Sequence, residues 1–206
     1  MTAKALSLFL LLLIAGMSLS CEKLDALLAG ASKGTLVASP GMSIEEIRRR
    51  STFPLAKDYR SGNEVFTVLS DSIAFDFELA GTGLKWPRCR FYNLQRYGEA
   101  PIHYVQIQVS KNISWAEAKR QLQETGEKLK RDGWTPSVVD GKNAEERLTE
   151  ALQGPAPGYQ VGFLWTKGDI SLNFDARRFP YAVNGEKADE GEPYEQELYI
   201  QTVEKK

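Results

Sequence analysis

Residues 104–134 read YVQIQVSKNISWAEAKRQLQETGEKLKRDGW, and they hold the clearest fold signal in the chain. The first part alternates apolar and polar side chains and places Val105, Ile107 and Val109 on one face. This period of two is typical of a β-strand with one buried face. The segment therefore predicts a strand, with a second kind of pattern directly after it.

That second pattern is helical. Ser114 and Glu117 form a capping box, because each side chain can bond the backbone N–H of the other residue. Gly133 stands where a C-terminal cap glycine belongs, and Gly126 inside the helix suggests close packing against a neighbour. One face of the expected helix holds Trp115, Ala118, Leu122, Thr125 and Leu129.

Working outward, similar signals recur along the chain. Two further capping boxes, Ser43 with Glu46 and Asn143 with Glu146, predict short helices. Further strands are expected at 64–69, 73–79, 88–94, 159–165, 170–174 and 195–203. This order favours an α+β fold, an antiparallel sheet with helices packed on one face. It leaves open a distant duplication of one helix-then-sheet unit.

The N-terminus has the pattern of an export signal. Residues 1–20 read MTAKALSLFLLLLIAGMSLS, with Lys4 before an apolar run over residues 5–15. A permanent membrane helix needs about 20 apolar residues, so this run better suits a cleaved signal peptide. An uncleaved N-terminal anchor helix is the alternative.

Ser18, Leu19, Ser20 and Cys21 follow the apolar run. They resemble the lipobox of bacterial lipoproteins, although Ser18 stands where that motif usually has Leu. The resemblance implies an acyl (palmitate-type) anchor on Cys21, which leaves Cys89 unpaired and buried. Ordinary secretion with a Cys21–Cys89 disulfide is the competing interpretation. If Cys21 is lipidated, Glu22 favours the outer membrane, because Asp at that position is the usual signal for inner-membrane retention.

These patterns divide the chain into three parts. Residues 1–20 are expected to be the signal peptide, and 21–40 a lipidated N-terminus with a flexible tether rich in Ala, Gly and Ser. Residues 41–206 are expected to form a single α+β domain.

Composition narrows the function. The chain is 42% hydrophobic and 26% charged, enough apolar material for a core, and its net charge of -1 gives no general attraction for nucleic acid. One His and the lack of CxxC, HExxH and phosphate-loop motifs predict no metal, no cofactor and no enzyme. The rival hypothesis is an exported hydrolase that uses carboxylates such as Asp76 and Glu78.

The strip from Trp86 to Tyr97 is dense in Trp, Tyr and Arg, the residue types that dominate protein interfaces. Pro87 should hold Trp86 extended, with its indole outward, while Arg88 and Arg90 project from one strand face and Cys89 from the other. The alternative is that the aromatic side chains fill the core. The predicted partner-binding residues are Trp86, Arg88, Arg90, Tyr92, Arg96 and Tyr97.

The sequence thus predicts a periplasm-facing lipoprotein, anchored in the membrane through Cys21, that binds another protein. A toxin-neutralising immunity protein is the preferred specific role, ahead of an envelope-assembly factor, because small exported domains without catalytic residues suit blocking roles. Gly41, Met42 and Ser43 at a helix start, with Pro54 beyond, also resemble the small lipoprotein of the outer-membrane barrel-assembly machinery. This match is short, and no domain family follows from it.

Overall fold

The structure is a computed structural model that describes residues 32–69, 73–154, 160–178 and 194–203. The chain divides into Met1–Ala31 and Ser32–Lys206, and all that follows concerns the second unit. The expected signal peptide, Cys21 and Glu22 lie outside the described residues. Within the described ranges, no helix has the length and apolar character needed to cross a bilayer.

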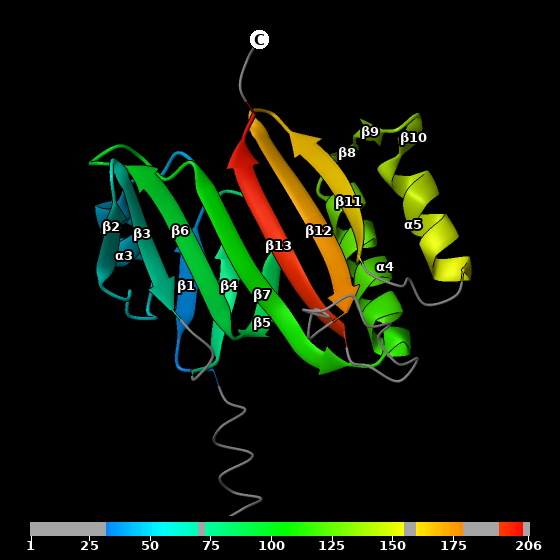
Figure 1. Cartoon of the computed structure of the whole chain (residues 1–206), viewed down its shortest axis with the longest axis horizontal. Helices are drawn as coiled ribbons and strands as arrows, with labels where there is room; N and C mark the ends of the chain where they lie inside the picture. The colour runs from blue at the N-terminus through cyan, green and yellow to red at the C-terminus, as the bar shows by residue number, and fades with distance from the viewer. Residues whose placement is uncertain (1–31, 70–72, 155–159, 179–193, 204–206) are drawn as a thin grey trace, which may run out of the picture. The chain divides into compact units, whose positions relative to one another are not determined.

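An antiparallel sheet of eight strands dominates this unit (Figure 1). In spatial order the strands are β2 (Asp58–Ser61), β3 (Glu64–Leu69), β6 (Phe91–Tyr97), β7 (Tyr104–Ile113), β13 (Tyr194–Thr202), β12 (Ile170–Arg178), β11 (Gln160–Lys167) and β8 (Thr135–Pro136). The expected strand at 104–109 is thus confirmed as part of β7, at the centre beside β13. The strands expected at 159–165, 170–174 and 195–203 correspond to β11, β12 and β13, and β11 and β12 pair as an antiparallel hairpin.

Among the described residues there are three helices: α3 (Ile44–Arg50), α4 (Trp115–Arg131) and α5 (Ala144–Gln153). The predicted caps begin all three helices, because the side chains of Ser43, Ser114 and Asn143 accept bonds from backbone N–H groups three residues later. The reciprocal bond of a full capping box is present at Asn143, whose N–H donates to the Glu146 carboxylate. Gly133 takes a positive φ of 77° just beyond α4, as a C-terminal cap requires. The fold is mostly β with these helices, which agrees with the α+β class at that level.

A second sheet was not predicted. It joins β1 (Thr35–Ala38), β4 (Phe75–Leu79) and β5 (Lys85–Cys89), with β1 parallel to β4. Leu36 and Ala38 in β1 are fully buried, so the prediction of a flexible tether through residue 40 is wrong for this part. Two short strands, β9 (Val138–Val139) and β10 (Lys142–Asn143), form a small ladder before α5.

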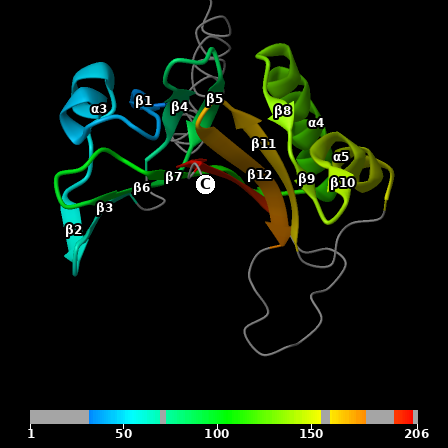
Figure 2. The same ribbon diagram turned by 90° about the horizontal axis from the view of Figure 1, so that it is seen from above.

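The main core lies on one side of the eight-stranded sheet. Figure 2 shows α3, the three-stranded sheet and the pair α4 and α5 on that same side. Leu122 and Leu129 of α4 are buried there, as the stripe predicts, together with Leu198 and Ile200 of β13. Gly126 is explained by close packing, since a Cβ atom there would lie 2.6 Å from Leu148 Cδ2 of α5. The other side of the sheet, which faces the viewer in Figure 1, is called the open face below.

Candidate functional site

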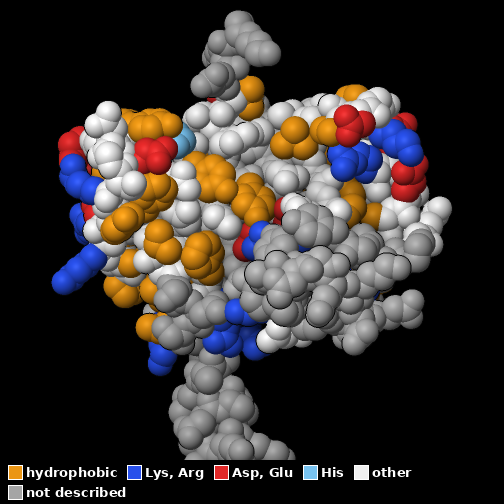
Figure 3. All heavy atoms as spheres, in the orientation of Figure 1, with side chains coloured by type: hydrophobic (Ala, Val, Ile, Leu, Met, Phe, Trp, Pro, Cys, Tyr) orange, Lys and Arg blue, Asp and Glu red, His pale blue; other side chains and the backbone are white. Residues whose placement is uncertain are grey.

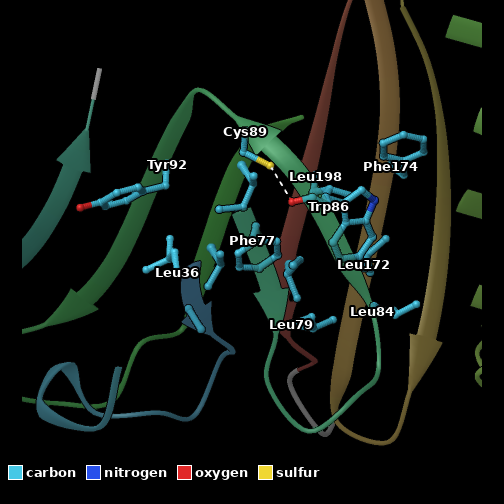
Figure 4. Close-up of a cluster of buried hydrophobic side chains, with 14 of the residues drawn as sticks. Leu36, Phe77, Leu79, Leu84, Trp86, Cys89, Tyr92, Leu172, Phe174 and Leu198 are labelled. Atoms are coloured by element: carbon cyan, nitrogen blue, oxygen red, sulfur yellow. Dashed lines mark hydrogen bonds between the residues drawn. The ribbon is translucent and has the colours of Figure 1, made fainter. Parts of the chain in front are cut away.

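Trp86 lies in the core, so the prediction that its indole points outward is wrong. Its ring is 3% exposed and stacks on Phe77, with ring centroids 5.8 Å apart (Figure 4). The cause is a β-bulge: Phe77 pairs with Trp86 but Phe75 pairs with Cys89, so β5 has one residue more than β4. Arg88 takes a positive φ of 60° at this point. The extra residue breaks the alternation and turns both Trp86 and Cys89 inward.

Tyr92 and Arg96 also fail as partner-binding residues, because both are buried on the helix side of β6. The Tyr92 hydroxyl accepts a 2.7 Å bond from the Ala56 N–H, and burial raises the pKa of Tyr92. Arg96 is paired with Asp58 at 2.7 Å. Although partial burial opposes it, hydrogen bonds from Arg96 and Thr67 hold the pKa of Asp58 below its usual value.

The remaining strip residues separate from one another. Tyr97 is 55% exposed, and its ring stacks on His103 with centroids 4.5 Å apart. Arg88 is exposed and Arg90 is half-buried, and both line a cleft beside α4. The predicted strip is therefore divided among the core, a half-buried ion pair, the open face and a cleft.

The open face has an aromatic half that includes the predicted Tyr97 and other rings that the sequence analysis did not name. Tyr59 pairs with Phe66 across β2 and β3, and their rings lie 6.3 Å apart. Tyr59 is 67% exposed, and Val68, two residues beyond Phe66, is 39% exposed. The pairing of β2, β3 and β6 places Tyr59, Phe66, Val68 and Tyr97 on the same face of the sheet. Figure 3 shows apolar side chains gathered over these strands. The sequence feature that could have located this pair is Gly62. Its turn sets the register of the β2–β3 hairpin, and that register places the Tyr59 ring beside the Phe66 ring.

The other half of the same face is a buried carboxylate cluster. Arg177 of β12 bonds Glu195 at 2.5 Å and Glu197 at 2.7 Å, both on β13. The Tyr199 hydroxyl donates to Glu197, and Asp175 lies directly opposite Glu197 in the sheet. The exposed fractions of the three carboxylates are only 0–2%. Further bonds to the cluster come from Gln106, Gln108 and Gln160.

Burial and repulsion shift the pKa values in this cluster. Burial, together with the nearby Glu197 charge, raises the pKa of Asp175 to about 7, against the hydrogen bond from Gln160. Burial and the same Glu197 raise the pKa of Tyr104 to about 12. A carboxyl group that titrates near neutrality is a frequent mark of catalysis. Here each of the three carboxylates is buried and accepts hydrogen bonds from neighbouring side chains, Asp175 from Gln160 and both Glu195 and Glu197 from Arg177.

The two carboxylates named for the hydrolase hypothesis lie outside the open face. Asp76 and Glu78 lie on β4, in the small sheet. Asp76 accepts bonds from the Ser32 hydroxyl and from the Arg88 N–H, and Glu78 pairs with Lys85 at 2.7 Å. These contacts hold strands together. In the described part of the chain, no group of three or more His, Cys, Asp and Glu side chains is arranged to hold a metal ion.

Cys89 is a free thiol that is fully buried. It donates a weak 3.5 Å bond to the Trp86 carbonyl, drawn in Figure 4. Burial raises the pKa of the thiol far above its usual value, so it is not a nucleophile.

The chain was also compared with known proteins, and it matches no family model, no curated protein and no solved structure.

Proposed function

We propose that this chain is a lipoprotein of the bacterial envelope, anchored through Cys21, that binds another protein through the aromatic half of its open face. The observation that carries the proposal is the pair Tyr59 and Tyr97, which are 67% and 55% exposed on one side of a sheet. Large aromatic side chains at such positions do not contribute to the core. They are among the residue types that dominate binding energy at protein interfaces.

The surroundings of these rings also suit a protein partner. The rings stand on strands of one sheet, and a sheet face offers a broad contact surface rather than a deep pocket. The exposed ion pair of Arg60 and Glu99, 3.2 Å apart, begins on the edge strand β2, at the residue that follows Tyr59. A patch of this kind favours binding over catalysis.

For the specific role we propose a toxin-neutralising immunity protein, ahead of an envelope-assembly factor. Both roles need an exported domain that covers part of a partner, and neither needs a reaction centre. Outer-membrane placement is part of the same proposal and rests on Glu22.

A pull-down from detergent-solubilised envelopes tests the proposal, with captured proteins identified by mass spectrometry. Replacing Tyr59 and Tyr97 by Ala should reduce capture of the specific partner at least tenfold, while the melting temperature changes little because both rings are exposed. Val138→Ala is the matched control, since Val138 is 69% exposed on β9, outside this patch. Equal capture by the double variant and the control would refute the aromatic half as the partner site.

We also propose that the domain arose by duplication. The strand order β2-β3-β6-β7 followed by β13-β12-β11-β8 supports this, because each half runs from an edge strand to a central last strand. In each half the edge strand is the first strand after a helix, α3 or α4. An experimental structure in which residues 43–113 and 114–203 cannot be superposed strand on strand would contradict the duplication.

A further inference from the structure

A cleft of about 660 Å³ lies between β5, β7 and α4, apart from the open face. Four cationic side chains line it: Arg88, Arg90, Lys111 and Arg120. Arg120 is already bound by Glu117 at 2.6 Å and by Glu124 at 2.5 Å. Arg88 and Arg90 form no ion pair with any described residue, so they leave positive charge at the mouth of the cleft.

A smaller space of about 310 Å³ adjoins the cleft and is called the inner space below. The two spaces share four lining residues, Pro87, Val109, Arg120 and Gln121. Trp86 and Phe174 line this inner space and make it partly apolar, and Figure 4 shows the Trp86 indole nitrogen on the side of Phe174. Glu124 reaches it as well, but its carboxylate is held by Arg120.

Three buried polar atoms of residues that line the inner space have no hydrogen-bond partner in the structure. They are the indole N–H of Trp86, a residue that is 3% exposed, Oε1 of Gln196, a residue that is 0% exposed, and Oε1 of Gln121. Buried indole N–H groups normally find an acceptor, because leaving one unpaired is unfavourable. An acceptor atom on a bound molecule would satisfy the Trp86 group.

The backbone beside the mouth is unusual at two positions. Arg88 and Asn112 both line the cleft, and both take positive φ, at 60° and 58°. Each marks a β-bulge, in β5 and in β7, where the pairing register shifts. Bulges bend strands and redirect side chains, and they concentrate beside binding sites. Here one of them brings Arg88 to the cleft.

We propose that this cleft binds an anionic amphiphile, a small molecule with a phosphate or carboxylate head and a short apolar tail. The head binds Arg88 and Arg90, because guanidinium groups pair with oxyanions through charge-assisted hydrogen bonds. The tail lies against Trp86, Val109 and Phe174, and an oxygen next to it accepts from the Trp86 N–H. This site is independent of the proposed protein partner, since it uses none of the open-face residues.

Titration calorimetry tests the proposal on the purified full chain, held in phosphatidylcholine nanodiscs because of the proposed lipid anchor. The probe is hexyl phosphate, with empty nanodiscs subtracted. 1-Hexanol has the same tail without the charge, and inorganic phosphate has the charge without the tail. Hexyl phosphate should bind at least tenfold more tightly than 1-hexanol or inorganic phosphate. Of the three compounds, it alone has both a charged head for the arginines and an apolar tail for the inner space.

Two variants then test whether the arginine charges, rather than a change in folding, account for the binding of hexyl phosphate. Arg88→Asn preserves the left-handed backbone, since Asn tolerates positive φ, and Arg90→Gln removes the second charge. Each should weaken hexyl phosphate at least threefold and leave 1-hexanol unchanged, and Arg90→Gln alone suffices if the first variant does not fold. Arg49→Gln removes an exposed charge on α3 and should have no effect. Undetectable binding of hexyl phosphate, or equal affinity in wild type and both cleft variants, would overturn the proposal whether or not a protein partner is found.

Discussion

Asp175 makes the stability of this domain depend on pH in a direction opposite to that of a salt-bridged carboxylate. Its pKa is raised to about 7 in the folded chain by burial and by the charge of Glu197. In the unfolded chain an Asp titrates near 3.9. Between these values the unfolded chain ionises while folded Asp175 keeps its proton. Stability from this group is therefore complete below about pH 4 and is lost as pH rises through about 7.

The magnitude follows from the two pKa values. A difference of about three units, at 1.36 kcal/mol each, amounts to roughly 4 kcal/mol at full ionisation. The neighbouring Glu195, Glu197 and Arg177 readjust when Asp175 changes charge, so a measured value of about 2–4 kcal/mol is expected. Asp175→Asn removes this dependence, because the amide has nearly the same shape and does not ionise.

Urea unfolding at several values between pH 5 and pH 8, followed by Trp fluorescence, measures the effect. The stability of Asp175→Asn relative to wild type should rise by about 1.5–2.5 kcal/mol from pH 5 to pH 8, because part of the full effect falls between pH 4 and pH 5. Glu127→Gln on the exposed face of α4 serves as the control and should follow wild type. A difference between Asp175→Asn and wild type that stays constant within about 0.5 kcal/mol over this range would refute the reasoning.

Three further predictions concern packing and anchoring. Trp86→Ala should lower the free energy of unfolding by about 3–5 kcal/mol in urea titrations, and a loss below about 1 kcal/mol would mean that the indole does not fill the core. Gly126→Ala should change the free energy of unfolding by less than about 1 kcal/mol, because the gain in helix propensity is offset by the shift that the new methyl group forces on the end of the Leu148 side chain. Combining it with Leu148→Ala should remove that shift in a double-mutant cycle, and simple additivity would argue against it. Labelled palmitate should enter wild type but not Cys21→Ser, and the labelled protein should fractionate with outer membranes, as Glu22 predicts; label in both proteins would exclude Cys21 as the acylated residue.

The sequence by itself determined the elements whose causes are local. The start of α4 depends on Ser114 and the backbone three residues later, and its buried stripe depends on spacing within one helix. The hairpin of β11 and β12 has the same character, because alternating side chains and a short turn specify it. The leader and Cys21 are equally local patterns, although the described residues do not include them.

Only the tertiary structure decided which surfaces are exposed. Pairing of β1 with β4 and of β7 with β13 joins segments far apart in sequence, which a local pattern does not record. The bulge at Arg88 reversed the outward face expected for Trp86, because one extra residue in a strand exchanges its two faces. Arg96 is buried because Asp58, on the edge strand β2, provides its counter-charge. The environment of each residue in the strip from Trp86 to Tyr97 therefore came from distant strands, which buried Trp86, Tyr92 and Arg96 and left Tyr97 exposed.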